Sequence, residues 1–287
     1  MTTSAAYLLA TATDHHGSLR ERVATTLAGC PVYRHAARYT PDTLADLAGR
    51  LAPTTNPGSE PVWGLCVETR PFAHLPNLVL ETAQRANIPV QVFHGPGNAH
   101  LLRDPMLDGL RAAGRLLTVD LGVDELSAPA YNRIFVDPRF WDALSGRGHI
   151  LVFQTDAALC KGSPRSLDSF LGWDYVGAGW ELRRPIGLDV AGGCGGLSLR
   201  GWHAHRAAAE VWDGPGFPGG EDCFFAFHIE LMGGKVAPLD EAAWFATQDR
   251  FLHPSFGAHQ IDRLPEDERA AFLRYAPEAA LARKYPD

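Results

Sequence analysis

The stretch HILVFQTD, residues 149–156, is the most strand-like in the chain and decides the fold class. Its branched and aromatic residues predict a buried strand, and the polar run Gln154-Thr155-Asp156 ends it. In open α/β sheets, ligands bind beyond the carboxyl ends of the strands. Asp156 is therefore a candidate ligand for a divalent cation, although an aspartate that only caps a turn would have the same pattern.

A second strand–helix–strand pattern lies upstream of this stretch. VWGLCVE at 62–68 is a predicted strand, a helix is expected over 75–86, and PVQVF at 89–93 is the next strand. This order predicts a parallel pair with a right-handed crossover, and thus an α/β fold. Further strands are expected at 116–119, 175–178 and 197–199, and helices over 131–144, 203–211 and 221–232.

The first 58 residues are expected to form a small α/β extension ahead of a main domain at 59–287. Residues 5–51 have a strand–helix–strand–helix pattern, and APTTNPGSEP at 52–61 holds three prolines and a glycine, which marks a boundary. A unit of about 50 residues is at the lower limit for a self-sufficient core. We therefore expect its apolar side chains to pack onto the main domain.

Composition limits the class of protein. Hydrophobic residues make up 46% and charged residues 21%, as in ordinary globular proteins. A net charge of −7 argues against a nucleic-acid-binding surface. No apolar run approaches the roughly 18 residues of a membrane span, and the start of the chain does not resemble a signal peptide. The five cysteines form no C-x-x-C pair, so we expect a cytoplasmic protein with reduced thiols.

Two glycine-containing stretches are candidate site segments. GGCGG at 192–196 would let the backbone approach a ligand closely, but a surface loop has the same composition, and no phosphate-binding signature follows. Gly219-Gly220-Glu221-Asp222 opens an apolar helix. Carboxylates at a helix start are favoured as caps and by the helix dipole, and one of them could also act as a general base.

Taken in order, these motifs resemble a family of poorly characterised glycosyltransferase-like proteins (DUF5672-like). The resemblance covers about residues 60–260 and leaves out residues 1–58. It implies a nucleotide-sugar-binding GT-A fold, a single α/β domain with a mixed, mainly parallel central sheet and flanking helices. The GG-x-S-L and GGED elements are also similar to acceptor and base motifs of animal β-galactosyltransferases. The matching segments are VETRP (67–71), FHGPGN (93–98), AYNRIF (130–135), FQTD (153–156), WDYVGAGW (173–180), GGLSLR (195–200), EDCFF (221–225) and FGAH (256–259).

The resemblance also implies residue roles. Asp156 matches the last acidic residue of a metal-binding D-x-D motif whose first position is Gln154 here, and His259 matches a late histidine that completes the metal site. Asp222 would be the catalytic base, with Glu221 beside it orienting the acceptor. The residues implied in substrate binding are Glu68, Thr69, Arg70, His94, Gly95, Asn98 and Gln154 for the donor, and Gly195 and Gly196 for the acceptor.

The function implied is an inverting glycosyltransferase. It would move a sugar from a nucleotide-diphosphate donor, a UDP- or GDP-sugar, to a hydroxyl of an acceptor glycan or small molecule. Mn²⁺ or Mg²⁺ would neutralise the leaving diphosphate, and a single carboxylate opposite the leaving group would give inversion. A nucleotide-sugar hydrolase or nucleotidyltransferase is an alternative. A non-catalytic nucleotide- or glycan-binding protein is another, because Gln154 replaces an acidic residue.

Overall fold

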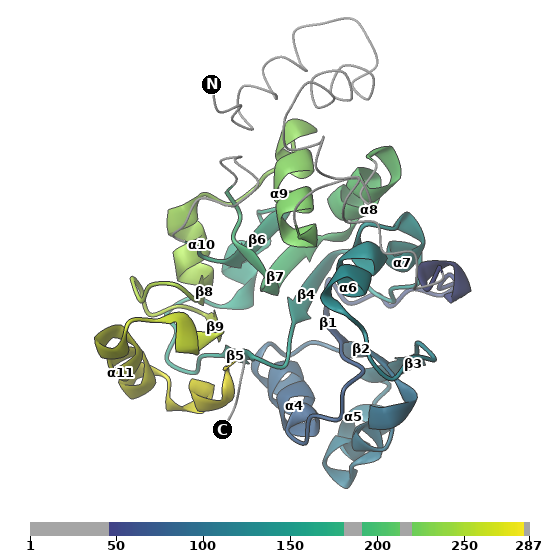
Figure 1. Cartoon of the computed structure of the whole chain (residues 1–287), viewed down its shortest axis with the longest axis horizontal. Coiled ribbons are helices and arrows are strands. Elements are labelled where there is room, and N and C mark those ends of the chain that lie inside the picture. Colours follow the sequence, from purple (N-terminus) through teal and green to yellow (C-terminus); the bar gives the residue numbers. More distant parts are fainter. Residues whose placement is uncertain (1–45, 181–190, 213–219, 284–287) are drawn as a thin grey trace, which may run out of the picture.

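The computed structural model describes residues 46–180, 191–212 and 220–283 (Figure 1). The strands are β1 (Val62–Val67), β2 (Val90–His94), β3 (Leu116–Asp120), β4 (His149–Phe153), β5 (Ala157–Leu159), β6 (Tyr175–Ala178), β7 (Cys194–Gly201), β8 (Ala246–Thr247) and β9 (Gly257–His259). The α-helices are α4 (Leu75–Arg85), α5 (Asp108–Ala112), α6 (Ala128–Phe135), α7 (Pro138–Asp142), α8 (Trp202–Val211), α9 (Glu221–Leu231), α10 (Leu239–Phe245) and α11 (Glu266–Tyr275). Short 3-10 helices are η2 (Ala48–Arg50), η3 (Pro96–Asn98), η4 (Leu101–Arg103), η5 (Pro105–Leu107), η6 (Leu167–Phe170), η8 (Ile261–Arg263) and η9 (Pro277–Leu281).

A six-stranded sheet with the order β3-β2-β1-β4-β7-β6 forms the centre of the fold. Strands β1 to β4 pair in parallel, whereas β7 runs antiparallel to both of its neighbours. The predicted α/β class with a mixed, mainly parallel sheet is therefore confirmed. This arrangement is consistent with a GT-A-like fold.

Helices cover both faces of this sheet, because side chains of successive strand residues point to opposite faces. On β1, Trp63, Leu65 and Val67 pack with α6, α7, α8 and α9, whereas Val62 and Cys66 pack with α4 and α10. Figure 1 shows the first helix group on one side of the sheet and α4, α5 and α10 on the other. Strand residues buried on both faces explain why β1 and β4 are continuous apolar runs.

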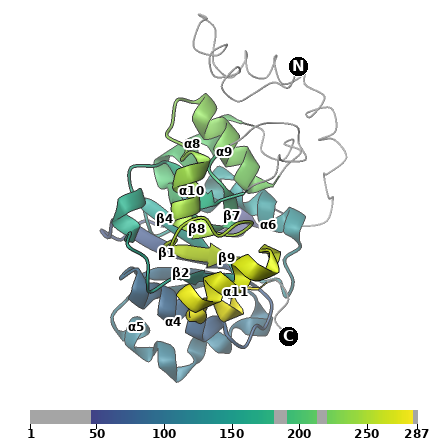
Figure 2. The same ribbon diagram turned by 90° about the vertical axis from the view of Figure 1, so that its left-hand side faces the viewer.

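A second, three-stranded sheet with the order β5-β9-β8 lies beside the first. Figure 2 shows β8 and β9 next to the central sheet, with α11 beyond them. Residues 256–282 and Cys160, which follows β5, close this end with a small apolar cluster of Cys160, Ala258, Ile261, Leu264, Phe272, Ala276, Ala279 and Ala282. The sequence did not predict this sheet, and it forms one wall of the candidate site.

Two local expectations need correction. The helix expected over 131–144 is two shorter helices, α6 and α7, because Pro138 cannot continue the hydrogen bonding of α6 and instead begins α7. Part of the glycine-rich stretch, Cys194–Gly196, belongs to strand β7 rather than to a loop before it.

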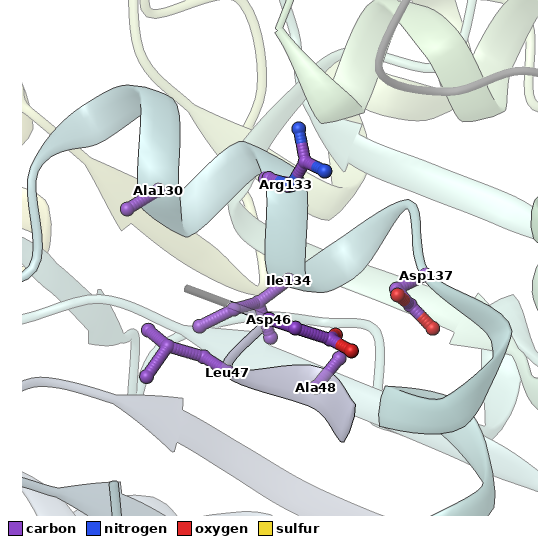
Figure 3. A pocket seen from close by; sticks show the side chains of 7 residues that line it. All are labelled: Asp46, Leu47, Ala48, Ala130, Arg133, Ile134 and Asp137. Atoms are coloured by element: carbon purple, nitrogen blue, oxygen red, sulfur yellow. The ribbon is translucent and has the colours of Figure 1, made fainter. Parts of the chain in front are cut away.

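The expected N-terminal extension lies mostly outside the described residues, since residues 1–45 are not described. At its end, Leu47 and Ala48 are buried in the cluster that contains Ile134 of α6. Figure 3 shows these residues lining a small pocket between η2 and α6, which Asp46, Ala130, Arg133 and Asp137 complete. None of these seven lining residues was predicted to be a site residue.

Two observations concern the cellular setting. Within the described ranges, no helix has the length and apolar character needed to cross a membrane. Cys66, Cys160, Cys194 and Cys223 carry free thiols. The cytoplasmic location itself stays a prediction.

Candidate functional site

Asp156 and His259 meet at the carboxyl end of β4. Strand β5 begins directly after Asp156, and it pairs antiparallel with β9 so that Ala157 lies opposite His259. Oδ1 of Asp156 is 3.2 Å from Nε2 of His259, and the two residues are only 9% and 1% exposed. The two side chains therefore lie within reach of one another, as the sequence analysis expected, and their role as metal ligands stays a prediction.

The pair forms a charged, buried unit. Burial by itself raises the pKa of the Asp156 carboxyl, but His259 and the Gln260 amide outweigh burial, so that pKa is lowered. Burial by itself lowers the pKa of His259, but the neighbouring Cys194 thiol and the Asp156 carboxylate raise it to about 10. The two side chains thus favour each other's charged forms, and a cation binding here would compete with a proton for Nε2.

The donor atoms of this pair fit a divalent cation. Oδ1 of Asp156 and Nε2 of His259 are both buried, and neither has a well-formed hydrogen bond within the described part of the chain. Two adjacent ligands at about 2.0–2.3 Å from a cation stand roughly 3 Å apart. The observed 3.2 Å matches this spacing. No cluster of three or more His, Cys, Asp or Glu side chains suited to a metal occurs among the described residues.

Two successive glycines of β7 border the pair and the start of α9. A Cβ at Gly196 would overlap the imidazole ring of His259, and a Cβ at Gly195 would overlap the Glu221 carboxylate. The Gly196 carbonyl also accepts a hydrogen bond from the backbone of Gln154 at 2.8 Å. Because successive residues of a strand face opposite ways, His259 and the start of α9 approach this end of β7 from its two sides.

Asp222 lies in the first turn of α9, beside Gly195. Its Oδ2 accepts a hydrogen bond from the Gly195 amide at 3.3 Å, and its Oδ1 accepts one from the Cys223 amide at 2.7 Å. The side chain is partly exposed. The carboxylate is therefore in part reachable from solvent.

Glu221 has a different environment from its neighbour. It is 4% exposed, and both of its carboxylate oxygens bind the Arg200 guanidinium, at 2.5 and 2.9 Å. Arg200 also donates to the Gly195 carbonyl at 3.1 Å and to the Ser198 hydroxyl at 2.8 Å. The fork–fork ion pair therefore fastens the start of α9 to Arg200 near the end of β7, and the bond to Gly195 links the same guanidinium to the start of β7. The predicted role of Glu221 in orienting an acceptor stays a prediction.

Arg200 is fully buried inside an aromatic box. Its guanidinium carbon lies 4.9 Å from the ring centre of Phe135, 5.7 Å from that of Tyr175 and 6.0 Å from that of Phe225. A buried charge is costly unless it is paired, and here Glu221 and the aromatic faces provide the pairing. The sequence analysis did not identify Arg200 as a site residue, although it belongs to the quoted GGLSLR motif.

Arg70 is the exposed member of the predicted donor group. It is half exposed, its guanidinium binds both oxygens of the buried Glu68 carboxylate, and it stacks over Phe72 at 4.7 Å. The imidazole of His74, four residues on, reaches the Thr155 carbonyl at 3.0 Å and so ties this segment to the end of β4. The hydrogen bonds with Glu68 raise the pKa of Arg70. The negative charges of Glu68 and Asp156 also raise it.

The other predicted donor residues that follow β1 and β2 are buried and hold the loops after these strands together, whereas Gln154, which follows β4, is partly exposed. Asn98 donates to the Glu68 carbonyl at 2.7 Å and accepts from the Gly95 amide at 2.9 Å. Thr69 accepts a hydrogen bond from the Leu126 amide at 3.0 Å. The His94 imidazole contacts the Gly95 carbonyl. These contacts give the residues framework roles, and their contact with a donor stays a prediction.

Tyr131 lies next to the candidate site, and the sequence analysis did not single it out. Its hydroxyl lies beside the Gln154 side chain, it is buried, and it has no well-formed hydrogen bond among the described residues. Burial, followed by the nearby Glu221 carboxylate, raises its pKa. Tyr131 belongs to the AYNRIF segment that the sequence analysis quoted. The sequence pattern of a short helix does not, however, indicate a functional role for a tyrosine.

Comparison with known proteins gives one family match. A family model described as "Protein of unknown function (DUF5672)" matches residues 124–259, a range that starts before α6 and ends at His259. The match supports the DUF5672 part of the resemblance and assigns no activity. No curated protein matches the chain.

Proposed function

We propose that this protein is a metal-assisted glycosyltransferase that moves a sugar from a nucleotide-diphosphate sugar to an acceptor hydroxyl with inversion. The observation that carries the proposal is the arrangement around β7. Gly196 borders the Asp156–His259 pair, and Gly195, the preceding residue, borders Asp222. A candidate cation site and a candidate base therefore flank one end of the central sheet.

The donor side of the reaction needs positive charge. Asp156 and His259 would hold a divalent cation, which supplies charge to neutralise the departing diphosphate. Arg70, half exposed and held by Glu68, would bind a phosphate oxygen of the donor. The Glu68 carboxylate keeps the guanidinium in one orientation, so less conformational entropy is lost when the donor binds.

The acceptor side needs a base, and Asp222 fits this role. Its carboxylate would take the proton of the acceptor hydroxyl while that oxygen forms a bond to the anomeric carbon. The bond between that carbon and the diphosphate oxygen breaks, and the diphosphate leaves with the electron pair. One displacement at the anomeric carbon inverts its configuration.

A ligand screen followed by product analysis tests the proposal. Thermal unfolding would be measured with UDP- and GDP-sugars, each with and without Mn²⁺, because a ligand at 100 times its Kd adds about 2.7 kcal/mol of stability. The donor that stabilises the protein would then be incubated with a panel of acceptor sugars and alcohols. Mass spectrometry would identify the products.

The products separate the proposal from its alternatives. An acceptor enlarged by one sugar unit supports transfer. Free sugar with no enlarged acceptor across the panel would indicate a hydrolase. A nucleotide joined to the acceptor would indicate a nucleotidyltransferase, and binding without any turnover would indicate a non-catalytic protein.

A further inference from the structure

Gln248 is buried and contacts the imidazole of His259. It is 1% exposed and follows β8, which pairs in parallel with β9, the strand that carries His259. Its Oε1 lies 2.6 Å from Nδ1 of His259. Because an amide oxygen only accepts hydrogen bonds, Nδ1 carries the hydrogen and Nε2 is the nitrogen available to a ligand.

Gln260 holds the other member of the pair. Its side-chain amide donates to Oδ2 of Asp156 at 2.9 Å, and its backbone amide donates to the Asp156 carbonyl at 3.0 Å. This leaves Oδ1, the oxygen that faces His259, as the unshared atom of the carboxylate.

The backbone of Gln260 is in an unusual conformation. Its φ of 50° and ψ of 56° lie in the left-handed region, which long side chains seldom adopt. Asn87 is the other non-glycine residue with positive φ in the described ranges. Backbone strain of this kind persists where the surrounding structure requires it, and it concentrates at functional sites. Here it places both amides of one residue on Asp156.

We infer that Gln248 and Gln260 are positioning residues that aim Nε2 of His259 and Oδ1 of Asp156 at one divalent cation. The inference rests on the metal-assisted form of the proposed function. Gln248 binds Nδ1 of His259, and Gln260 binds Oδ2 of Asp156. In each ligand residue, the bound atom is the one that does not face the other ligand residue. The two unshared atoms then face each other, and Gly196, which has no side chain, lies close against the imidazole ring at Nε2.

The inference distinguishes these amides from ordinary core hydrogen bonds. A core hydrogen bond contributes to folding stability, and its loss lowers the unfolding temperature. A bond that orients a metal ligand also sets cation affinity, and removal of such partners costs about 10- to 100-fold in metal affinity. Affinity and stability must therefore be measured on the same variants.

The experiment is calorimetric titration of Mn²⁺ into the full-length protein without any substrate. Gln260→Gly removes the side chain but suits positive φ, so we expect an unchanged or higher unfolding temperature together with about 10- to 100-fold weaker Mn²⁺ binding. Gln260→Asn, which also tolerates this backbone conformation, is expected to weaken binding because its amide is one methylene shorter.

Gln248 is tested by loss and by rescue. Gln248→Leu removes the acceptor from Nδ1 and is expected to weaken Mn²⁺ binding about 10- to 100-fold. Gln248→Glu retains an acceptor and adds charge, so it should bind Mn²⁺ at least as well as the wild type and show that the acceptor matters. Gln84→Leu, at an exposed position of α4, is the matched control and should bind as the wild type does.

The outcomes separate two kinds of failure. If the wild type binds Mn²⁺ and all four variants bind it equally, the positioning role is overturned while the cation site stands. If the wild type itself binds no Mn²⁺, the metal-assisted form of the proposed function fails, and the positioning role fails with it. If Gln248→Leu does not fold, the Gln260→Gly result alone decides.

Discussion

His259 lies with its Nε2 atom 3.2 Å from Oδ1 of Asp156, although the two residues come from distant parts of the sequence. The antiparallel register of β5 and β9 sets this distance, because it places Ala157 opposite His259. Both strands have only three residues. The site therefore depends on a short piece of sheet, which the helices of the C-terminal segment hold in place.

Asp222→Asn tests the base. The variant keeps nearly the same shape and most of the capping ability of the side chain, but an amide cannot accept the acceptor's proton. General-base catalysis contributes about 10²- to 10⁴-fold, so kcat for sugar transfer should fall by that factor while donor Kd stays unchanged. Steady-state kinetics measure this. A folded Asp222→Asn protein that keeps more than about a third of kcat would show that Asp222 is only a cap.

Arg70→Ala tests the donor side. Removal of a half-exposed guanidinium that binds phosphate should raise the donor KM more than it lowers kcat, because the contact exists in both ground and transition states. Arg274→Ala, an exposed arginine of α11, is the matched control and should change neither constant. A fall in kcat at unchanged KM would assign Arg70 to the chemical step instead.

Gly196→Ala tests the close packing of β7 against the His259 ring. The new methyl group would overlap the imidazole, which Gln248 prevents from moving away, so Mn²⁺ binding should be lost. Overpacking of this kind also costs about 1–3 kcal/mol of stability. Gly109→Ala in α5, where a Cβ meets no neighbouring atom, should raise stability by about 0.5–1 kcal/mol. Unchanged Mn²⁺ affinity in Gly196→Ala would place the cation elsewhere.

Stability at acid pH depends on two buried histidines. Burial lowers the pKa of His205 and lowers that of His228 to about 3. Unfolded histidines take up protons near pH 6.5, whereas these two stay neutral in the folded protein, so the free energy of unfolding falls as pH drops from about 6.5 towards 3. Each contributes a slope of up to about 1.4 kcal/mol per pH unit.

Urea unfolding at several pH values measures this slope. His228→Leu should reduce the slope by about one histidine's share, whereas the exposed His100→Leu should leave it unchanged. Equal slopes in His228→Leu and the wild type would contradict the assignment of a neutral, buried His228.

Much of the central sheet was predictable from the sequence, because long apolar runs and helical periodicity are local signals. The β1–α4–β2 unit and β4 have such signals, and the structure has them within one residue of the predicted bounds. Pro138 indicates the break between α6 and α7, because proline begins helices and does not continue them. The apolar residues on both sides of it nevertheless favoured one continuous helix.

The site was predictable only in part. Asp156 follows a strong strand, and the FGAH motif identified His259, so the pair could be proposed before its geometry was known. Gln248 and Gln260 belong to no motif, and the role proposed for them rests on contacts to His259 and Asp156 that short strands create. The Arg200–Glu221 pair was likewise hidden, because an arginine inside a strand pattern does not reveal its partner.

The most direct test of the central claim is calorimetric binding of UDP and GDP to the wild type and to His259→Gln, each with and without Mn²⁺. If Asp156 and His259 form a cation site that binds a diphosphate, Mn²⁺ should strengthen nucleotide binding in the wild type and have no such effect in His259→Gln. A wild type that binds neither nucleotide more tightly with Mn²⁺, or a His259→Gln protein that retains the full effect of Mn²⁺, would contradict the claim.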